Sequence, residues 1–283
     1  MRVPRTRRTI ALLIVGIAAF VTIKRQTRSM YTAPLAPEPS SAAASRTRQD
    51  LFVELQPVRL AKCELARFGE PNDGGYLLCG NLLAGASAAY SYGISGYDGW
   101  GCDISRKLRI AAHQYDCFDS TRPSCQGDTS FHEECIAFAP HADERGRRFE
   151  TLEHQLTANG HDAARVVVKM DVEGAEWDVL LAAPDAVLDS IDQLVVEFHG
   201  TAEPKYVETV RRLKRFFLVA HLHFNNYSCW DALEPFPAWA YEVSFVNKRL
   251  DTEAGGAPPV PHRLDAANNL RAPDCQRAGA QLK

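Results

Sequence analysis

Short, uninterrupted apolar runs alternate with segments of helical apolar spacing through the middle of this chain, and no other feature limits its fold as strongly. Short apolar runs are typical of strands that are covered on both faces of a sheet. The last two runs alternate apolar and polar residues, as strands with one solvated face do. The predicted strands span residues 89–94, 115–118, 135–138, 166–170, 194–198, 218–224 and 241–247.

Between these runs, apolar residues recur every three or four positions, which predicts helices with one apolar stripe. The stripes consist of Ile104, Leu108 and Ala111; Phe149, Leu152 and Leu156; and Tyr206, Val210, Leu213 and Phe217. Strands that alternate with helices build βαβ units. The sequence therefore predicts an α/β fold with a Rossmann-like, mostly parallel sheet of about seven strands flanked by helices.

An uncharged apolar run at residues 10–23 lies between two groups of basic residues. The basic flanks indicate a membrane-targeting segment, although the run is shorter than the roughly 20 residues of a comfortable span. We expect a signal anchor within residues 1–25, with a cytosolic N-terminus because more basic residues precede the run than follow it. A cleaved signal peptide is the alternative.

Two segments around the predicted domain lack apolar periodicity. Residues 26–50 are rich in Ala, Ser, Thr and Pro, which predicts a flexible stem. Apolar side chains become sparse in residues 249–283, which predicts a disordered tail. A single folded unit is therefore expected over residues 51–248. The formal net charge of −3 gives no support for nucleic-acid binding.

Eight cysteines, an even number, are expected if the domain faces an oxidising compartment. The sequence leaves their pairing open. A sequon at Asn226 can be glycosylated only in the secretory lumen. These features predict a single-pass membrane protein of the Golgi or endoplasmic reticulum with a luminal domain, and secretion is the alternative.

In open α/β sheets, ligands bind beyond the carboxyl ends of the strands. The first predicted strand runs into a turn with Gly93 and Gly96, and glycines let the backbone approach a nucleotide-like ligand. Asp119 ends the second strand near the ~20-residue spacing of a ribose-binding carboxylate. These three residues are predicted to bind a cofactor. A simple strand-to-helix turn and a turn cap are the alternatives.

Three carboxylates, Asp171, Glu173 and Glu176, follow the fourth strand at a strand-to-helix turn. Mutual repulsion raises the pKa of at least one of them unless a cation, a metal or helix N-terminal amides compensate. Helix capping explains one or two of these residues but not all three. We therefore predict that the group serves catalysis.

Glu197 and His199 end the fifth strand, and their spacing points both side chains to the same side of an extended chain. Together they can deprotonate a hydroxyl acceptor, and a structural histidine is the alternative. His221 and His223 suggest a metal site with the acidic group, but no third ligand has suitable spacing. No metal site is therefore predicted.

Several ordered blocks of the chain share a pattern with a known family. They are RFG at 67–69, NDGGY at 72–76, YSYGI at 90–94, FD at 118–119, KMDVEGAE at 169–176 and EFH at 197–199. Over about residues 63–248 the chain thereby resembles the methyltransferase-like family related to FkbM-type methyltransferases. The resemblance implies S-adenosylmethionine held by Gly93, Gly96 and Asp119. Since no acidic residue directly precedes Gly93, Asp98 or Asp73 is expected to replace it.

The leading hypothesis is an S-adenosylmethionine-dependent O-methyltransferase that acts on a hydroxylated small molecule or glycan in the secretory lumen. One alternative is a glycosyltransferase, because the turn at Asp171 and Glu173 can bind manganese for a sugar nucleotide. Another is a non-catalytic luminal binding module with the same fold.

Overall fold

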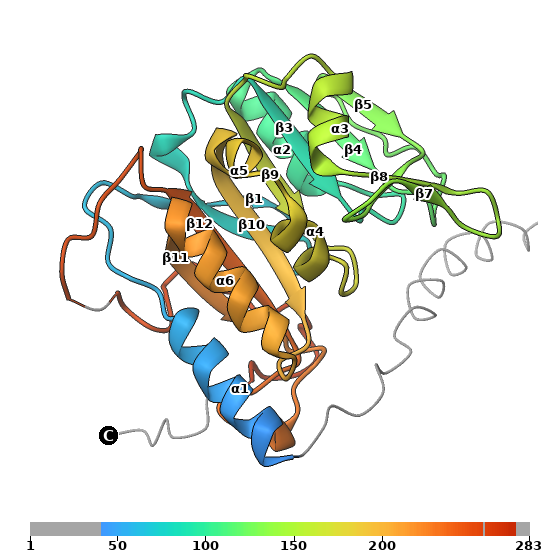
Figure 1. Cartoon of the computed structure of the whole chain (residues 1–283). Coiled ribbons are helices and arrows are strands. Elements are labelled where there is room, and N and C mark those ends of the chain that lie inside the picture. Colours follow the sequence, from blue (N-terminus) through green and yellow to red (C-terminus); the bar gives the residue numbers. More distant parts are fainter. Residues whose placement is uncertain (1–40, 257, 276–283) are drawn as a thin grey trace, which may run out of the picture. The chain divides into compact units, whose positions relative to one another are not determined.

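The computed structural model describes residues 41–256 and 258–275 (Figure 1). The predicted signal anchor and the predicted stem up to residue 40 lie outside these residues. No helix in the described part of the chain is long and apolar enough to cross a membrane.

A seven-stranded, mostly parallel sheet forms the middle of the domain (Figure 1). Its strands are β3 (Ala88–Tyr92), β4 (Ala111–Tyr115), β5 (Thr129–His132), β9 (Val166–Met170), β10 (Ile191–His199), β11 (Phe217–Phe224) and β12 (Ala240–Asn247). Their order is β11-β12-β10-β9-β3-β4-β5, and only β12 runs antiparallel to the other strands. The prediction of an α/β fold with a mostly parallel sheet is confirmed.

Helices cover one face of this sheet, and a helix with a hairpin covers the other. The α-helices of the described residues are α1 (Ala42–Glu54), α2 (Gly99–Leu108), α3 (Leu152–Ala158), α4 (Glu176–Ala182), α5 (Asp185–Ser190) and α6 (Pro204–Phe216). Val168 of β9 belongs to the large core that contains Leu180 of α4 and Val210 of α6. Its neighbour Val167 faces the second core, with Trp100 of α2. Burial on both faces explains why β9 is apolar throughout.

Two smaller sheets accompany the central one. The hairpin of β1 (Leu65–Gly69) and β2 (Gly75–Cys79) packs on the face of α2 and contacts β10, β11 and β12. The side-chain amide of Gln193 in β10 both donates to and accepts from the backbone of Cys79, at 2.9 and 2.8 Å. The third sheet consists of β6 (Cys135–Ile136), β7 (His141–Ala142) and β8 (Arg148–Glu150). Short 3-10 helices, η1 (Gly80–Leu82) and η2 (Asp231–Leu233), complete the elements.

The most apolar predicted strands agree best with the structure. The prediction for residues 166–170 coincides with β9, and those for 194–198, 218–224 and 241–247 lie within β10, β11 and β12. The prediction for 115–118 is wrong in its bounds, since β4 ends at Tyr115. The prediction for 135–138 is wrong about the sheet to which the strand belongs, because β6 pairs with β8 outside the central sheet.

The domain begins earlier than residue 51. Helix α1 starts at Ala42, inside the predicted stem, and the Ser41 hydroxyl accepts the Ala44 amide at 3.2 Å as an N-cap. Leu51 and Leu55 at the other end of this segment are fully buried. The predicted stem therefore does not extend to residue 50.

The segment after residue 248 is also part of the domain. The Asp251 carboxylate accepts the amides of Lys62 and Cys63, and Asp265 binds His221 at 2.7 Å. The expectation of a disordered tail is thus wrong for the described residues up to 275. Polar contacts and a disulfide hold this segment. Apolar periodicity does not reveal such contacts, which is why the sequence predicts disorder here.

All eight cysteines are paired. The disulfides are Cys63–Cys79, Cys102–Cys125, Cys117–Cys135 and Cys229–Cys275. Structural disulfides persist in oxidising compartments. The domain is therefore built for a secretory-type environment, as the even cysteine count predicts.

Candidate functional site

The turn after β3 requires glycine at two positions. Gly93 has φ 71°, and a Cβ atom there would lie 1.6 Å from the Asp171 carbonyl oxygen. Gly96 has φ 72°, and a Cβ atom would lie 2.9 Å from Asp119 Oδ2. Residues with a side chain rarely adopt this backbone conformation, and a Cβ atom at either position would also be too close to the neighbouring segment. The turn therefore brings bare backbone against the segments that contain Asp171 and Asp119.

Asp116 holds this turn in place, and sequence reasoning missed it. Its Oδ2 atom accepts the amides of Ile94 and Ser95 at 3.1 and 2.8 Å. Its Oδ1 atom accepts the amides of Phe118 and Asp119 at 2.8 and 3.1 Å. The predicted strand at residues 115–118 places Asp116 in its interior, whereas Asp116 is the first residue after β4. It is a positioning residue for both predicted cofactor-binding loops.

The predicted acidic cofactor contacts Asp119 and Asp98 differ in availability. Asp119 is half-buried, and its Oδ1 atom accepts the Thr121 amide at 2.8 Å. Asp98 is buried, caps α2 by accepting the Gly101 amide at 2.8 Å, and accepts from Gln114 at 2.9 Å. Helix capping and the Gln114 contact account for Asp98, so Asp119 is the better candidate. Asp73 accepts from Asn268 at 3.3 Å.

Asp171, Glu173, Glu176 and His199 meet at the carboxyl edge of β9 and β10, and we call them the acid–imidazole cluster. His199 Nδ1 lies 2.6 Å from Glu176 Oε1. His199 Nε2 faces Glu173 Oε2 at 3.6 Å and Asp171 Oδ1 at 3.9 Å. The structure thus brings together four of the five predicted catalytic residues.

Two cations partly offset the carboxylates of this cluster. Burial acts to lower the pKa of His199, but the carboxylates of Glu176, Glu197 and Asp171 outweigh it and raise that pKa to about 10. Lys169 lies 3.5 Å from Asp171 and donates to the carbonyls of Tyr92 and Gly93 at 3.1 Å. The compensating cations that three close carboxylates require are therefore His199 and Lys169. Lys169 also links the cluster to the glycine turn.

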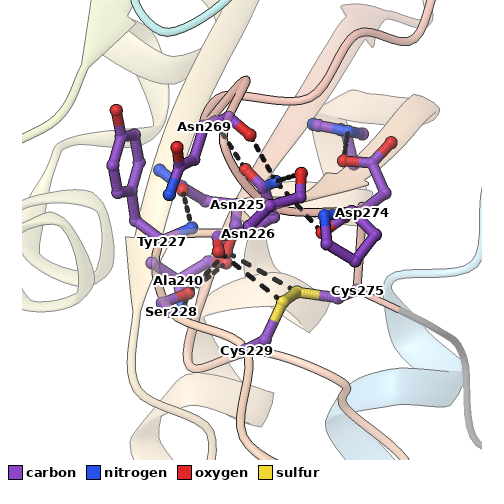
Figure 2. The surroundings of a disulfide bond; sticks show 12 residues. Asn225, Asn226, Tyr227, Ser228, Cys229, Ala240, Asn269, Asp274 and Cys275 are labelled. Carbon is purple, nitrogen blue, oxygen red and sulfur yellow. Dashed lines mark hydrogen bonds and ion pairs between the residues drawn. A yellow bond between two sulfur atoms is a disulfide. The ribbon is translucent and has the colours of Figure 1, made fainter.

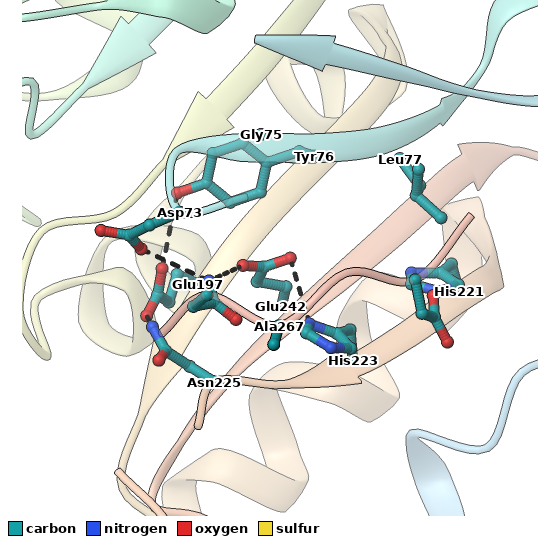
Figure 3. Close-up of polar contacts among 12 residues, drawn as sticks. Asp73, Gly75, Tyr76, Leu77, Glu197, His221, His223, Asn225, Glu242 and Ala267 are labelled. Atoms are coloured by element: carbon teal, nitrogen blue, oxygen red, sulfur yellow. Dashed lines mark hydrogen bonds and ion pairs between the residues drawn. The ribbon is translucent and has the colours of Figure 1, made fainter. Parts of the chain in front are cut away.

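Glu197, the fifth predicted catalytic residue, has partners of its own. Its Oε2 atom accepts from the Tyr76 hydroxyl at 3.4 Å, and its Oε1 atom accepts from Asn225 at 2.7 Å (Figure 3). Burial raises the pKa of Glu197 well above its usual range, and Asp171 adds to the shift. The Tyr76 hydroxyl also donates to Asp171 at 3.3 Å. Glu197 is therefore linked to the cluster through Tyr76. The sequence did not predict Tyr76 as part of the site, although the residue lies in the NDGGY block.

The polar row continues across the sheet to the later histidines. Glu242 is opposite both Glu197 and His223 in the strand register, and its Oε2 atom lies 3.7 Å from His223 (Figure 3). His221 pairs with Asp265 instead. Among the described residues, the one group arranged as potential metal ligands is Asp171, Glu173 and His199. His221 and His223 therefore hold the C-terminal segment rather than join the acidic group.

The predicted sequon residue Asn226 is enclosed (Figure 2). Its Oδ1 atom accepts the Asn269 amide at 2.6 Å, and its Nδ2 atom donates to the carbonyls of Asn269, Ala272 and Pro273 at 3.0 to 3.2 Å. The backbone carbonyl oxygen of Asn226 lies 3.7 Å from Cys229 Sγ of the Cys229–Cys275 disulfide. A glycan on Asn226 is incompatible with this arrangement, so the residue anchors the C-terminal segment instead.

Comparisons of the chain with known protein families, with curated proteins and with solved structures find no match.

Proposed function

We propose that this protein is an S-adenosylmethionine-dependent O-methyltransferase that acts on a hydroxylated small molecule or glycan. The observation that supports it is the glycine turn at Gly93 and Gly96, which packs against Asp119 on one side and Asp171 on the other. A cofactor loop and an acid–base cluster are thereby neighbours at the carboxyl edge of a parallel sheet, where ligands of such sheets bind.

The residues around the turn fit the cofactor. Gly93 and Gly96 let the turn pack closely against the segments that contain Asp171 and Asp119, and a half-buried carboxylate such as Asp119 can accept both ribose hydroxyls. Asp116 would keep the two loops at a fixed separation. Bound S-adenosylmethionine supplies an electrophilic methyl group.

The acid–imidazole cluster would hold the acceptor. The Asp171 backbone packs against Gly93, so an acceptor hydroxyl bound by this residue would be near the methyl group. Lys169 and Tyr76 fix the Asp171 carboxylate, and Glu176 fixes the ring of His199. Such prearranged groups promote transfer mainly by positioning. The four disulfides, together with the sequence-predicted anchor, favour action in the lumen of the Golgi or endoplasmic reticulum.

Calorimetry with S-adenosylhomocysteine on the full-length chain tests the proposal. We expect stoichiometric binding that Asp119→Ala weakens at least tenfold, because the ribose loses its acceptor. Asp162→Ala is the matched control, since that side chain is exposed and outside the site. Asp171→Ala should lower turnover more than cofactor affinity. Absence of binding by the unmodified chain would overturn the proposal.

A manganese-dependent glycosyltransferase is the second candidate, favoured by the closeness of Asp171, Glu173 and His199. Thermal stabilisation by a nucleotide sugar with Mn²⁺, without stabilisation by S-adenosylhomocysteine, would select it. A non-catalytic binding module would instead tolerate substitution of the whole acid–imidazole cluster without loss of cellular function.

A further inference from the structure

Three potential metal ligands converge at the edge of β9 and β10. The facing atoms are Asp171 Oδ1, Glu173 Oε2 and His199 Nε2, all within 4.8 Å of one another. The His199 atom lies 3.9 and 3.6 Å from the two oxygens. Ligand atoms about 2.1 Å from a tetrahedral zinc ion lie about 3.4 Å apart. Small side-chain movements are therefore enough to coordinate one ion.

His199 is oriented as metal-binding histidines are. Its side chain is 4% exposed, and its Nδ1 atom is bonded to Glu176, which is completely buried. Its Nε2 atom points into the cluster. Among the described residues, Asp171 Oδ1 and Glu173 Oε2 face this atom, and both lie beyond hydrogen-bond distance. A carboxylate on one ring nitrogen fixes the ring and makes the other nitrogen a better ligand. Glu176 therefore has the place of the outer partner of a metal-binding histidine.

The two carboxylates are also arranged for this purpose. Asp171 uses Oδ2 for Tyr76 and Lys169, which leaves Oδ1 toward His199. Glu173 has φ 56°, which is rare for a residue with a side chain, and this turn directs its carboxylate back to His199. The Glu173 side chain is nevertheless exposed, so solvent or a substrate oxygen can complete the coordination.

We propose that Asp171, Glu173 and His199 bind one divalent transition-metal ion, manganese or zinc, with Glu176 as a positioning residue. One imidazole nitrogen with two carboxylate oxygens suits these ions, whereas calcium prefers oxygen ligands alone. Every described cysteine is in a disulfide, so thiolates do not compete for the ion. The leading interpretation of the sequence assigned these three residues to acid–base chemistry without a metal, and only the glycosyltransferase alternative placed manganese at Asp171 and Glu173.

The role of the ion, unlike the site, rests on the proposed function. In a methyltransferase the ion would bind the acceptor oxygen and lower the pKa of its hydroxyl group. This favours acceptors with two neighbouring hydroxyl groups, which can chelate the ion through both oxygens. The predicted acceptor class is therefore a vicinal diol, as sugars and catechols contain.

Titration of the full-length chain with Mn²⁺, after chelator treatment and in detergent, tests the site. Free Mn²⁺ is followed by its electron paramagnetic resonance signal, and we expect one bound ion per chain. Glu173→Gln should weaken binding at least tenfold. Since the Glu173 side chain is exposed, this variant should keep its fold. Glu153→Gln, the same change at an exposed position of α3, should bind as the unmodified chain does.

A second measurement tests His199 itself. Electron spin echo modulation of the bound Mn²⁺ should reveal coupling to one imidazole nitrogen. The proposal is overturned if the unmodified chain binds no ion, if Glu173→Gln binds as tightly as the unmodified chain, or if nitrogen coupling is absent. Calorimetry with S-adenosylhomocysteine separates this outcome from the proposed function. Binding of Mn²⁺ without the nucleoside overturns the methyltransferase alone, and the reverse result overturns the metal site alone.

Discussion

Two histidines are buried on the same sheet in opposite electrostatic surroundings. His199 ends β10 in the acid–imidazole cluster. His113 lies in β4, stacked on Tyr90 with ring centroids 5.0 Å apart, and its Nδ1 atom lies 3.1 Å from His132. We call the second group the aromatic–histidine cluster; its members are Tyr90, His113, Tyr115, His132 and His161.

The neighbours, and not burial alone, decide the charge of each ring. Burial lowers the pKa of both imidazoles. Carboxylates reverse the effect at His199 and raise its pKa to about 10, whereas His132 and His161 add to it at His113, whose pKa falls to about 4. In the metal-free protein, His199 is therefore charged at neutral pH and His113 is neutral.

The two rings affect stability in opposite directions as pH changes. With an ordinary pKa of 6.5 in the unfolded chain, His199 binds its proton more tightly in the folded state. Its contribution is complete below pH 6.5 and is lost as pH rises toward 10. His113 binds its proton more tightly in the unfolded state. Its surroundings therefore reduce stability as pH falls from 6.5 toward 4.

Glu176→Gln should have the largest effect, because it removes the carboxylate that bonds to His199. Breaking a buried ion pair leaves a charge uncompensated and costs about 3–5 kcal/mol. We expect urea denaturation at pH 7 to report a loss of that size, measured on metal-free protein. The pKa of His199, followed by NMR, should fall, because Glu176 contributes most to raising it.

Glu153→Gln again serves as the control, with an expected change in the free energy of unfolding below about 0.5 kcal/mol. A Glu176→Gln variant as stable as the unmodified chain, with the pKa of His199 still near 10, would show that Glu176 does not hold the charge. The contrast between the two clusters would then have another origin.

His113→Phe should have the next largest effect, and it concerns the acidic side of the pH range. The unmodified chain should lose stability between pH 6.5 and 4, because His113 binds a proton in the unfolded state over this range but stays neutral in the folded state. Phenylalanine keeps the stacking on Tyr90 and cannot titrate. We expect the variant to lose about 2 kcal/mol less over this interval, allowing for partial solvent screening.

Urea denaturation of both proteins at pH 7, 5.5 and 4.5 measures this difference. His154→Phe, on the exposed surface of α3, is the control and should leave the pH profile unchanged. If His113→Phe shows the same loss at low pH as the unmodified chain, His113 is not the group that titrates.

The same contrast explains how much of the fold the sequence predicts. Strand β9 is apolar on both faces and was predicted to the residue. Strands β4 and β5 contain polar side chains of the aromatic–histidine cluster, which interrupt the apolar pattern that would have predicted these strands. Gln114 is buried in β4 because Asp98 accepts its amide, a partner that only the folded chain supplies.

The candidate site divides in a similar way. Asp171 and Glu176 follow β9, and His199 ends the neighbouring parallel strand β10. The carboxyl ends of such strands meet at one edge, so the closeness of these residues was predictable. Tyr76 comes from the hairpin β1–β2, and Asn225 follows β11. Their contacts with Glu197 depend on how distant segments pack, which local patterns do not encode. Asp116 was hidden by an error of a few residues in the end of β4.

Tyr90→Phe should have the smallest effect, and Tyr92→Phe is its matched partner. Both tyrosines lie in β3, and both are completely buried. The Tyr90 hydroxyl bonds to His161 at 2.7 Å, whereas the Tyr92 hydroxyl has no hydrogen-bond partner among the described residues. Removing the Tyr90 hydroxyl should lower the free energy of unfolding by about 1 kcal/mol, because water can only partly replace this hydroxyl at the half-buried His161. Removing the Tyr92 hydroxyl relieves an unsatisfied buried group, so Tyr92→Phe should be neutral or stabilising. Thermal denaturation at pH 7 compares the pair directly, and a larger loss in Tyr92→Phe would mean that polar satisfaction does not organise this cluster.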